Sequence, residues 1–141
     1  MTTPVRFAYA AIAASRSAGN LLAYLPITLR HGTHVLGVTG LLDTGSTVNV
    51  LPYPMGLQLG FVWEQQTTQV HLTGSLARLP ARGAIVSGQV ASFPPVDLAF
   101  AWTQATDVPM ILGQVNFFME FNVCFFRSQT AFEVNPKGKA N

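Results

Sequence analysis

The sequence predicts a single all-β domain, and three observations lead to that expectation. The chain has 141 residues, which gives room for one domain of ordinary size but not for two. Short runs rich in Val, Ile, Leu, Phe and Thr recur along it, and Gly, Pro, Asn or Ser interrupt them about every eight to twelve residues. Only one segment, near the C-terminus, has apolar residues at the three- and four-residue intervals of a helix. Many short, regularly interrupted strands are typical of an all-β fold.

The domain proper is expected to start near Leu21. Residues 1–20 are rich in Ala, Ser and Thr and end in Ser-Ala-Gly-Asn, so we expect an N-terminal arm or first strand there. The domain then spans residues 21–136, and residues 137–141 form a polar tail. Seven strands are expected inside the domain, at residues 23–29, 33–42, 47–51, 67–72, 84–90, 96–102 and 122–126.

The segment with helical spacing is residues 114–121 (QVNFFMEF). Its apolar residues Val115, Phe118 and Met119 recur at intervals of three and four, which predicts one short helix near the C-terminus. After it, residues 125–132 carry apolar residues at both ends and Arg-Ser-Gln-Thr between them. That pattern predicts a closing hairpin with a polar turn.

The composition predicts a partner for the apolar surface. Hydrophobic residues make up 49% of the chain and charged residues only 10%, an excess that favours burial against another chain or a membrane. The longest uncharged stretch, residues 44–63, contains two prolines and three glycines, a poor composition for a membrane-spanning helix. Self-association is therefore the better interpretation, and we expect no membrane span.

Charge and cysteine content exclude several other classes. The formal net charge is +2 and the basic residues are scattered, so no nucleic-acid partner is expected. Cys124 is the only cysteine, which rules out an internal disulfide and fits a small strand residue in a cytoplasmic protein. Residues 7–14 (FAYAAIAA) follow a basic residue and keep export by an atypical N-terminal signal as the alternative location.

The three histidines do not predict a metal site. His31 and His34 flank a Gly-Thr turn, and His71 is distant in sequence, so the set lacks the spacing of a helical metal-binding pair. Loop histidines in solvent are the favoured interpretation. We expect no metal and no cofactor.

One acidic residue stands in an unusual place. Asp43 lies in residues 40–52 (GLLDTGSTVNVLP), where two apolar runs enclose Asp-Thr-Gly-Ser. An acid on a tight loop between buried strands is costly to desolvate, so it is retained where it has chemistry to perform or is well hydrogen-bonded. Gly45 suits a sharp bend because it lacks a Cβ and tolerates positive φ. The hydroxyls of Thr44 and Ser46 can donate to nearby oxygens.

These residues resemble a known family. Residues 41–46 (LLDTGS) resemble the active-site signature of aspartic peptidases. Ile111-Leu112-Gly113 resembles the apolar-apolar-Gly segment that packs beneath that loop in retropepsins, and Thr73-Gly74-Ser75 resembles the tip of their flap hairpin. The resemblance covers roughly residues 21–134. It implies a single-lobe, retropepsin-like barrel with aspartic endopeptidase activity, in which Asp43 is the catalytic residue.

The chain departs from the family pattern at two places. Retroviral members usually follow the apolar-apolar-Gly segment with an Arg that braces the dimer, whereas this chain has Gln114. The dimer contact must then be braced differently. The flap candidate lacks the several glycines of the retroviral type, so a turn at residues 80–83 is the alternative flap tip.

A single catalytic Asp implies two chains. Aspartic peptidases need two carboxylates that share a proton, and neither Asp97 nor Asp107 lies in an Asp-Thr-Gly context. The resemblance therefore implies a homodimer in which Asp43 meets a second Asp43 across a twofold axis and Thr44 reaches the partner's loop backbone. A peptide substrate would bind extended, as an added strand. Apolar side chains expected to line its pockets are Val48, Leu76, Ile85 and Ile111.

Other hypotheses remain beside the peptidase. The fold could serve as a dimerisation or peptide-binding module with weak or no catalysis, although nothing in residues 43–46 is damaged. A small all-β structural or membrane-associated protein would require the motif to be coincidence. Within the peptidase hypothesis, Ser46 is expected to donate a hydrogen bond to the catalytic carboxylate, which would place the acid limb of activity at low pH.

Overall fold

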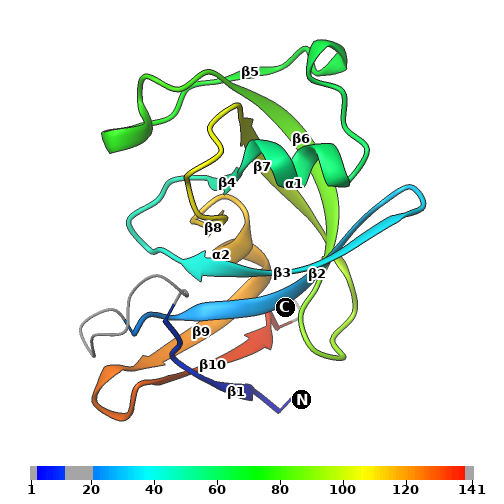
Figure 1. The fold of residues 1–141 in the computed structure, drawn as a ribbon. Helices are drawn as coiled ribbons and strands as arrows, with labels where there is room; N and C mark the ends of the chain where they lie inside the picture. The colour runs from blue at the N-terminus through cyan, green and yellow to red at the C-terminus, as the bar shows by residue number, and fades with distance from the viewer. Residues whose placement is uncertain (1–2, 12–20, 139–141) are drawn as a thin grey trace.

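The computed structural model describes residues 3–11 and 21–138, and over these ranges the regular structure is mostly β-strand (Figure 1). Residues 12–20 hold most of the expected N-terminal arm and part of the segment considered as a signal, and they lie outside the described residues. The strands are β1 (Val5–Ala8), β2 (Tyr24–His31), β3 (His34–Leu42), β4 (Asn49–Leu51), β5 (Gln69–Val70), β6 (Ala81–Gln89), β7 (Val96–Thr103), β8 (Ile111–Leu112), β9 (Phe121–Phe126) and β10 (Ala131–Pro136). The helices are α1 (Tyr53–Gln58) and α2 (Phe117–Glu120). The all-β expectation is confirmed.

The larger sheet curls into a barrel. Its strand order is β2-β3-β8-β4-β7-β6-β5, and β2 also pairs with β6, which joins the two sides of the sheet. β2 and β3 form a hairpin whose register sets His31 opposite His34. Gly32 in its turn has a φ of +58°, which a glycine adopts without strain. The expected Gly-Thr turn is therefore confirmed.

The smaller sheet contains both ends of the described chain. Its order is β1-β10-β9, all antiparallel, and Figure 1 shows it beneath the barrel. Its apolar side chains pack on the barrel core: Phe132 is fully buried, and the Phe7 ring stacks on it with centroids 5.3 Å apart. The expected hairpin near residues 125–132 is formed by β9 and β10, with Arg127–Gln129 as a 3-10 turn between them.

The barrel core is centred on aromatic residues. Trp102 is fully buried, stacks on Tyr53 of α1 at 5.4 Å and meets Trp63 edge-on at 5.3 Å. A Cβ at Gly56 would come within 2.1 Å of the Trp102 ring, so α1 can pack here only because this position lacks a side chain. Helix α1 was not expected from the sequence, since prolines precede and open it, although proline is tolerated in a first turn.

Three expected elements differ from those observed. The expected strand at 47–51 begins at Asn49, and the strand at 67–72 pairs only over two residues, β5. The helix expected at 114–121 is confined to α2, because the amides of Gln114 and Val115 donate to another loop instead of opening a helix. His31 is also not a free loop residue: its ring stacks on Phe61 at 4.0 Å.

No helix in residues 3–11 and 21–138 is long and apolar enough to cross a membrane. The same residues hold no cluster of three or more His, Cys, Asp or Glu side chains that could bind a metal ion.

Candidate active site

Asp43 lies directly at the end of β3, beside the end of β8. These strands run parallel, with Leu41 opposite Ile111 and Leu42 opposite Leu112. The backbone amide of Asp43 donates to the Leu112 carbonyl at 3.0 Å, which continues the pairing by one residue. Leu42 is buried and anchors the strand, while the side chain of Asp43 is half-buried. The two sequence motifs that carried the resemblance are thus neighbours in space.

The segment after β8 holds the loop of residues 43–48 at three further points. The amides of Gln114 and Val115 donate to the carbonyls of Ser46 and Thr47 at 2.9 and 3.0 Å. The Gln114 side chain donates from Nε2 to the Thr44 carbonyl at 2.9 Å. Gln114, the residue found where retroviral members carry an Arg, therefore braces a loop of the same chain.

One oxygen of the Asp43 carboxylate is hydrogen-bonded within its own loop, and the other has no donor among the described residues. Its Oδ1 accepts a hydrogen bond from the Gly45 amide at 2.9 Å. Among the described residues no donor reaches Oδ2, and Asp43 forms no ion pair. Gly45 does not adopt positive φ, so that part of the expectation is wrong; a Cβ there would lie 3.3 Å from Oδ1. The glycine allows close approach to the acid rather than an unusual backbone angle.

The Ser46 hydroxyl has a different partner from the expected one. It donates to the Val48 carbonyl at 2.7 Å, and a hydroxyl has one proton to donate. The expectation that Ser46 donates to the carboxylate of Asp43 is therefore wrong. Its hydrogen bond closes the loop on itself, because Val48 lies where the loop returns toward β4.

Gly113 is enclosed by the loop it supports. A Cβ at this position would lie 2.4 Å from the Val48 carbonyl oxygen and 2.8 Å from that of Ser46. Both neighbours are backbone atoms, which cannot rotate away as a side chain could. The Gly113 amide donates to the Oδ1 of Asn49 at 2.8 Å. No other residue type fits between loop and barrel here.

Two asparagines beneath the loop were missed in the sequence analysis. Asn49 is fully buried and donates to the Ala99 carbonyl at 3.0 Å and to the Oδ1 of Asn116 at 3.1 Å. Asn116 accepts from the Ala99 amide and donates to the Asp97 carbonyl. The pair joins β4, β7 and the segment after β8. The sequence carried one signal for Asn49: it is a polar residue inside the apolar run at residues 47–51.

The flap candidate lies in the connection between β5 and β6. Gly74 has a φ of +65° and begins a 3-10 turn, Gly74–Leu76, that contains two of the three residues Thr73, Gly74 and Ser75. The alternative tip at residues 80–83 falls at the start of β6, so it is not a turn. Leu72 is buried and packs in one cluster with Val50 and Ile111. This connection therefore folds against the apolar side of the site.

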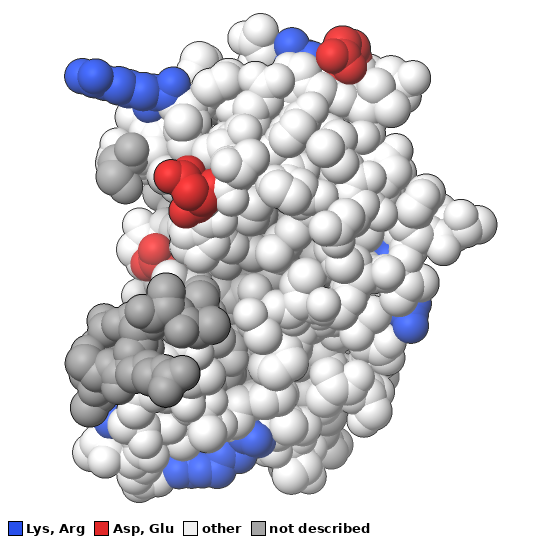
Figure 2. Space-filling view, in the orientation of Figure 1, with Lys and Arg blue, Asp and Glu red and all other residues white. Residues whose placement is uncertain are grey.

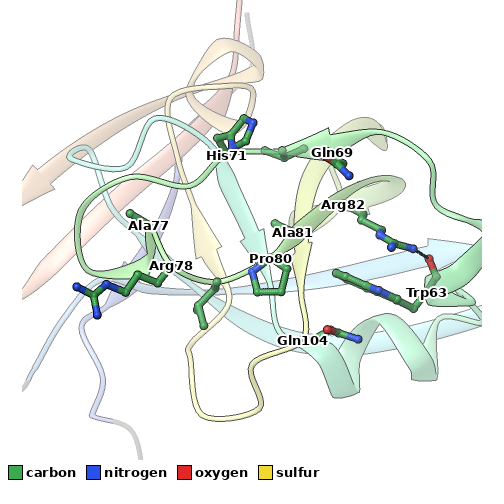
Figure 3. Close-up of a pocket in the computed structure, with 11 residues that line it drawn as sticks. Trp63, Gln69, His71, Ala77, Arg78, Pro80, Ala81, Arg82 and Gln104 are labelled. Atoms are coloured by element: carbon green, nitrogen blue, oxygen red, sulfur yellow. Dashed lines mark hydrogen bonds between the residues drawn. The ribbon is translucent and has the colours of Figure 1, made fainter.

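Two cavities lie near this region. An apolar cavity of about 300 Å³ is lined by Val48 from the Asp43 loop and by Val115. The other lining residues come from β6, from β7 and from the segment at β5: Gly83, Ala84, Ile85, Ala99, Phe100, Ala101, Thr68 and Val70. Leu76 and Ile111 do not line it; they pack in the neighbouring apolar cluster. A second cavity, of about 460 Å³, is enclosed by the β5–β6 connection, Trp63 and Gln104 (Figure 3). It does not include Asp43.

The charged groups of the second cavity do not converge on it. Arg82 donates to the Trp63 carbonyl at 2.6 Å and lies over the Trp63 ring at 4.5 Å. Figure 3 shows Arg78 directed away from the other labelled residues. The wider surface is also poor in charge, and Figure 2 shows a face on which acidic and basic side chains are few and scattered.

Comparisons with known proteins bear on the fold. No family model matches the chain, and no curated protein matches it. A retropepsin-like aspartic protease from Rickettsia conorii superimposes with a TM-score of 0.61 at 11% identity, over 96% of this chain and 100% of that one. The protease of EIAV complexed with the inhibitor HBY-793 gives a TM-score of 0.49 at 17% identity, over 71% of this chain and 88% of that one. The first likeness, together with the barrel described above, shows that the fold is retropepsin-like.

Proposed function

We propose that this chain, with its retropepsin-like fold, is one subunit of a homodimeric aspartic endopeptidase whose catalytic pair is Asp43 and the partner's Asp43. The observation that carries the proposal is the placement of Asp43. Its loop donates a hydrogen bond to Leu112 and accepts others from Gln114 and Val115, and its Oδ2 meets no donor of the described chain. Two carboxylates can share a proton only if each is held in place by its loop and keeps one oxygen free to face the other.

The reaction follows from bringing two such carboxylates together. Two acids a few ångströms apart cannot both ionise, so one holds a proton and the other is charged. The charged Asp43 takes a proton from a water molecule, whose oxygen attacks the peptide carbonyl carbon, while the protonated partner donates to the carbonyl oxygen. In the second step the C–N bond breaks as the nitrogen receives the proton that Asp43 gained, while one hydroxyl of the tetrahedral intermediate returns its proton to the partner's carboxylate. A carboxylic acid and an amine leave, and the shared proton is restored.

The substrate is proposed to be an extended peptide with apolar side chains near the cleaved bond. The supporting observation is the apolar cavity beside the Asp43 loop, which no charged residue lines. The β5–β6 connection, with Gly74 in its turn, is proposed to cover the bound peptide as the flap. An extended segment offers backbone groups to such a hairpin and side chains to the cavity.

The proposal is tested by changing the carboxylate to its isosteric amide. Asp43→Asn should retain the folded dimer and lower peptidase activity by at least about a thousandfold, because an amide can neither take nor share the proton. Asp107→Asn is the matched control, since Asp107 is exposed and lies outside the motif. It should keep wild-type activity.

The wild-type protein should also bind a transition-state mimic with a statine-like hydroxyl tightly, because only a working pair of carboxylates recognises it. Residual activity of Asp43→Asn above about a thousandth of wild type would place the catalytic carboxylate elsewhere. A wild-type protein that binds peptides without cleaving them would instead be a peptide-binding module.

A further inference from the structure

The four residues from Asp43 to Ser46 form a β-turn. The Ser46 amide donates to the Asp43 carbonyl at 3.1 Å, which is the hydrogen bond between the first and fourth residues of such a turn. Neither of the two central residues, Thr44 and Gly45, has positive φ. Types II, I′ and II′ each require positive φ at a central residue, so this turn is of type I.

The central peptide group of the turn, which joins Thr44 to Gly45, takes part in two hydrogen bonds. Its carbonyl accepts from the Nε2 of Gln114 at 2.9 Å, and its amide donates to the Oδ1 of Asp43 at 2.9 Å. A trans peptide group is planar, and its carbonyl and N–H point in opposite directions. A donor that holds the carbonyl on one side therefore directs the N–H toward the carboxylate on the other.

Gly45 gives this turn an alternative conformation. Type II needs positive φ at the third residue, which glycine adopts without strain. Types I and II differ mainly in a rotation of the central peptide group by about 180°. In type II the Gly45 amide would point away from Asp43, and the Thr44 carbonyl oxygen would take its side of the turn. The carboxylate would then lose a donor and face an acceptor.

Packing does not select between the two turn types, because Thr44 and Gly45 are both exposed. Among the described residues, the Thr44 carbonyl accepts only from Gln114 and the Gly45 amide donates only to Asp43. The backbone of Gln114 is itself anchored, since its amide donates to the Ser46 carbonyl at 2.9 Å. Apart from Asp43, Gln114 is thus the described residue whose side chain favours the observed turn.

We propose that Gln114 is a positioning residue for the catalytic carboxylate: its side chain holds the turn of residues 43–46 in type I and so keeps the Gly45 amide on Oδ1 of Asp43. The role in catalysis rests on the proposed function, because it assumes that Asp43 is the catalytic residue. With Oδ1 held in this way, the orientation of the open Oδ2 is fixed before a partner carboxylate or substrate arrives. Glutamine supplies the donor without adding a charge beside the acid.

The turn can be observed without any measurement of activity. Gln114→Met removes the donor and keeps a side chain of similar length. In nuclear magnetic resonance, type I brings the amide protons of Thr44 and Gly45 together, whereas type II brings the Thr44 Hα next to the Gly45 amide proton. Wild type should show the first contact, and Gln114→Met should show the second as well. Gln66→Met is the matched control, since the Gln66 side chain makes only an exposed hydrogen bond of 3.4 Å to the Val62 carbonyl. It should keep the wild-type turn.

A second substitution removes the alternative conformation. Alanine disfavours positive φ, so Gly45→Ala should close off type II. Its Cβ would lie 3.3 Å from the Oδ1 of Asp43, so this variant alone should have lower activity than wild type. In the Gly45→Ala background, however, Gln114→Met should leave the turn in type I.

The kinetic constants should follow the turn. Gln114→Met should lower kcat about three- to tenfold and change KM by less than about twofold, because the net effect of one hydrogen bond corresponds to about that factor. In the Gly45→Ala background the same substitution should change kcat by less than about twofold. The Tm of Gln114→Met should fall by less than about 5 °C, so the protein stays folded in the assay.

The outcomes separate this role from the peptidase proposal. A turn that flips in Gln114→Met, but not in the double variant, supports the control of the turn by Gln114; if wild type then cleaves no peptide, the enzyme alone is overturned. If Gln114→Met keeps the type I turn, the positioning role is overturned, and an active wild type leaves the enzyme standing. A kcat that is unchanged although the turn flips, or that falls equally in the wild-type and Gly45→Ala backgrounds, also overturns the positioning role.

Discussion

Gly113→Ala is the substitution whose effect follows most directly from the geometry of the site. The added Cβ would lie 2.4 Å from the Val48 carbonyl oxygen and 2.8 Å from that of Ser46. Cβ atoms rarely approach an oxygen closer than about 3.2 Å, so the loop of residues 43–48 must move outward by roughly 0.5–1 Å or the new side chain must strain β8. Either adjustment weakens the hydrogen bonds that hold Asp43.

The cost can be estimated from these contacts. Overpacking a tight site by one methyl group costs about 1–3 kcal/mol, and weakening one or two of the hydrogen bonds to the loop adds about 1 kcal/mol. The free energy of unfolding should therefore fall by about 2–4 kcal/mol, which for a domain of this size corresponds to a drop in Tm of roughly 6–12 °C. Peptidase activity should fall by more than the loss of folded protein explains, because a shift of about 1 Å at a catalytic group can lower the rate about a hundredfold.

The assay is a thermal melt combined with peptide cleavage well below the Tm. Gly37→Ala is the matched control, since Gly37 lies in β3, leads toward the same loop and has no atom within 4 Å of a built Cβ. The control should melt within about 2 °C of wild type. If Gly113→Ala melts together with Gly37→Ala and keeps full activity, the loop is not packed against Gly113 as described.

Three further predictions concern the same site. Asn49→Ala should lower the free energy of unfolding in urea by about 2–4 kcal/mol, because it leaves the buried amide of Gly113 without an acceptor. Gln66→Ala, which removes only an exposed hydrogen bond of 3.4 Å to the Val62 carbonyl, should cost under about 0.5 kcal/mol. Ser46→Ala should leave the acid limb of the pH–rate profile in place, since its hydroxyl donates to Val48 and not to the catalytic carboxylate; an upward shift of that limb would contradict this geometry. Specific activity should fall on dilution as dimers separate, and activity that stays constant to the lowest measurable concentration in a monomeric protein would argue against a divided site.

Sequence patterns were sufficient for the barrel and for the position of the acid. The alternation of apolar residues and the regular turns placed six of the seven expected strands close to β2, β3, β4, β6, β7 and β9. Asp43 was found because a charge between two apolar runs is unusual. Ile111-Leu112-Gly113 was found because it resembles the apolar-apolar-Gly segment that packs beneath the active-site loop in retropepsins. The structure confirms that these segments are in contact.

The parts that were missed depend on long-range contacts. β8 is too short to show a pattern and exists because β3 and β4 pair with it. β1 lies within the expected N-terminal arm or first strand, but only its pairing with β10 fixes its bounds. The partner of the Ser46 hydroxyl could not be predicted, because the loop turns so that the Val48 carbonyl lies nearer than the carboxylate. Asn49 and Asn116 are far apart in sequence, and only the fold shows that each satisfies the other. Local periodicity carries no information about such pairs.

Subunit mixing tests most directly the claim that each site needs two copies of Asp43. Wild-type protein is incubated with an equal amount of Asp43→Asn protein until the subunits exchange, and peptide cleavage is compared with that of the same amount of wild type alone. Random pairing leaves about a quarter of all dimers with two intact carboxylates, so total activity should fall to about half. A ninefold excess of the variant should reduce it to about a tenth. If activity stays unchanged or rises at both ratios while mass measurements show that mixed dimers have formed, one Asp43 suffices for catalysis and the shared catalytic pair is wrong.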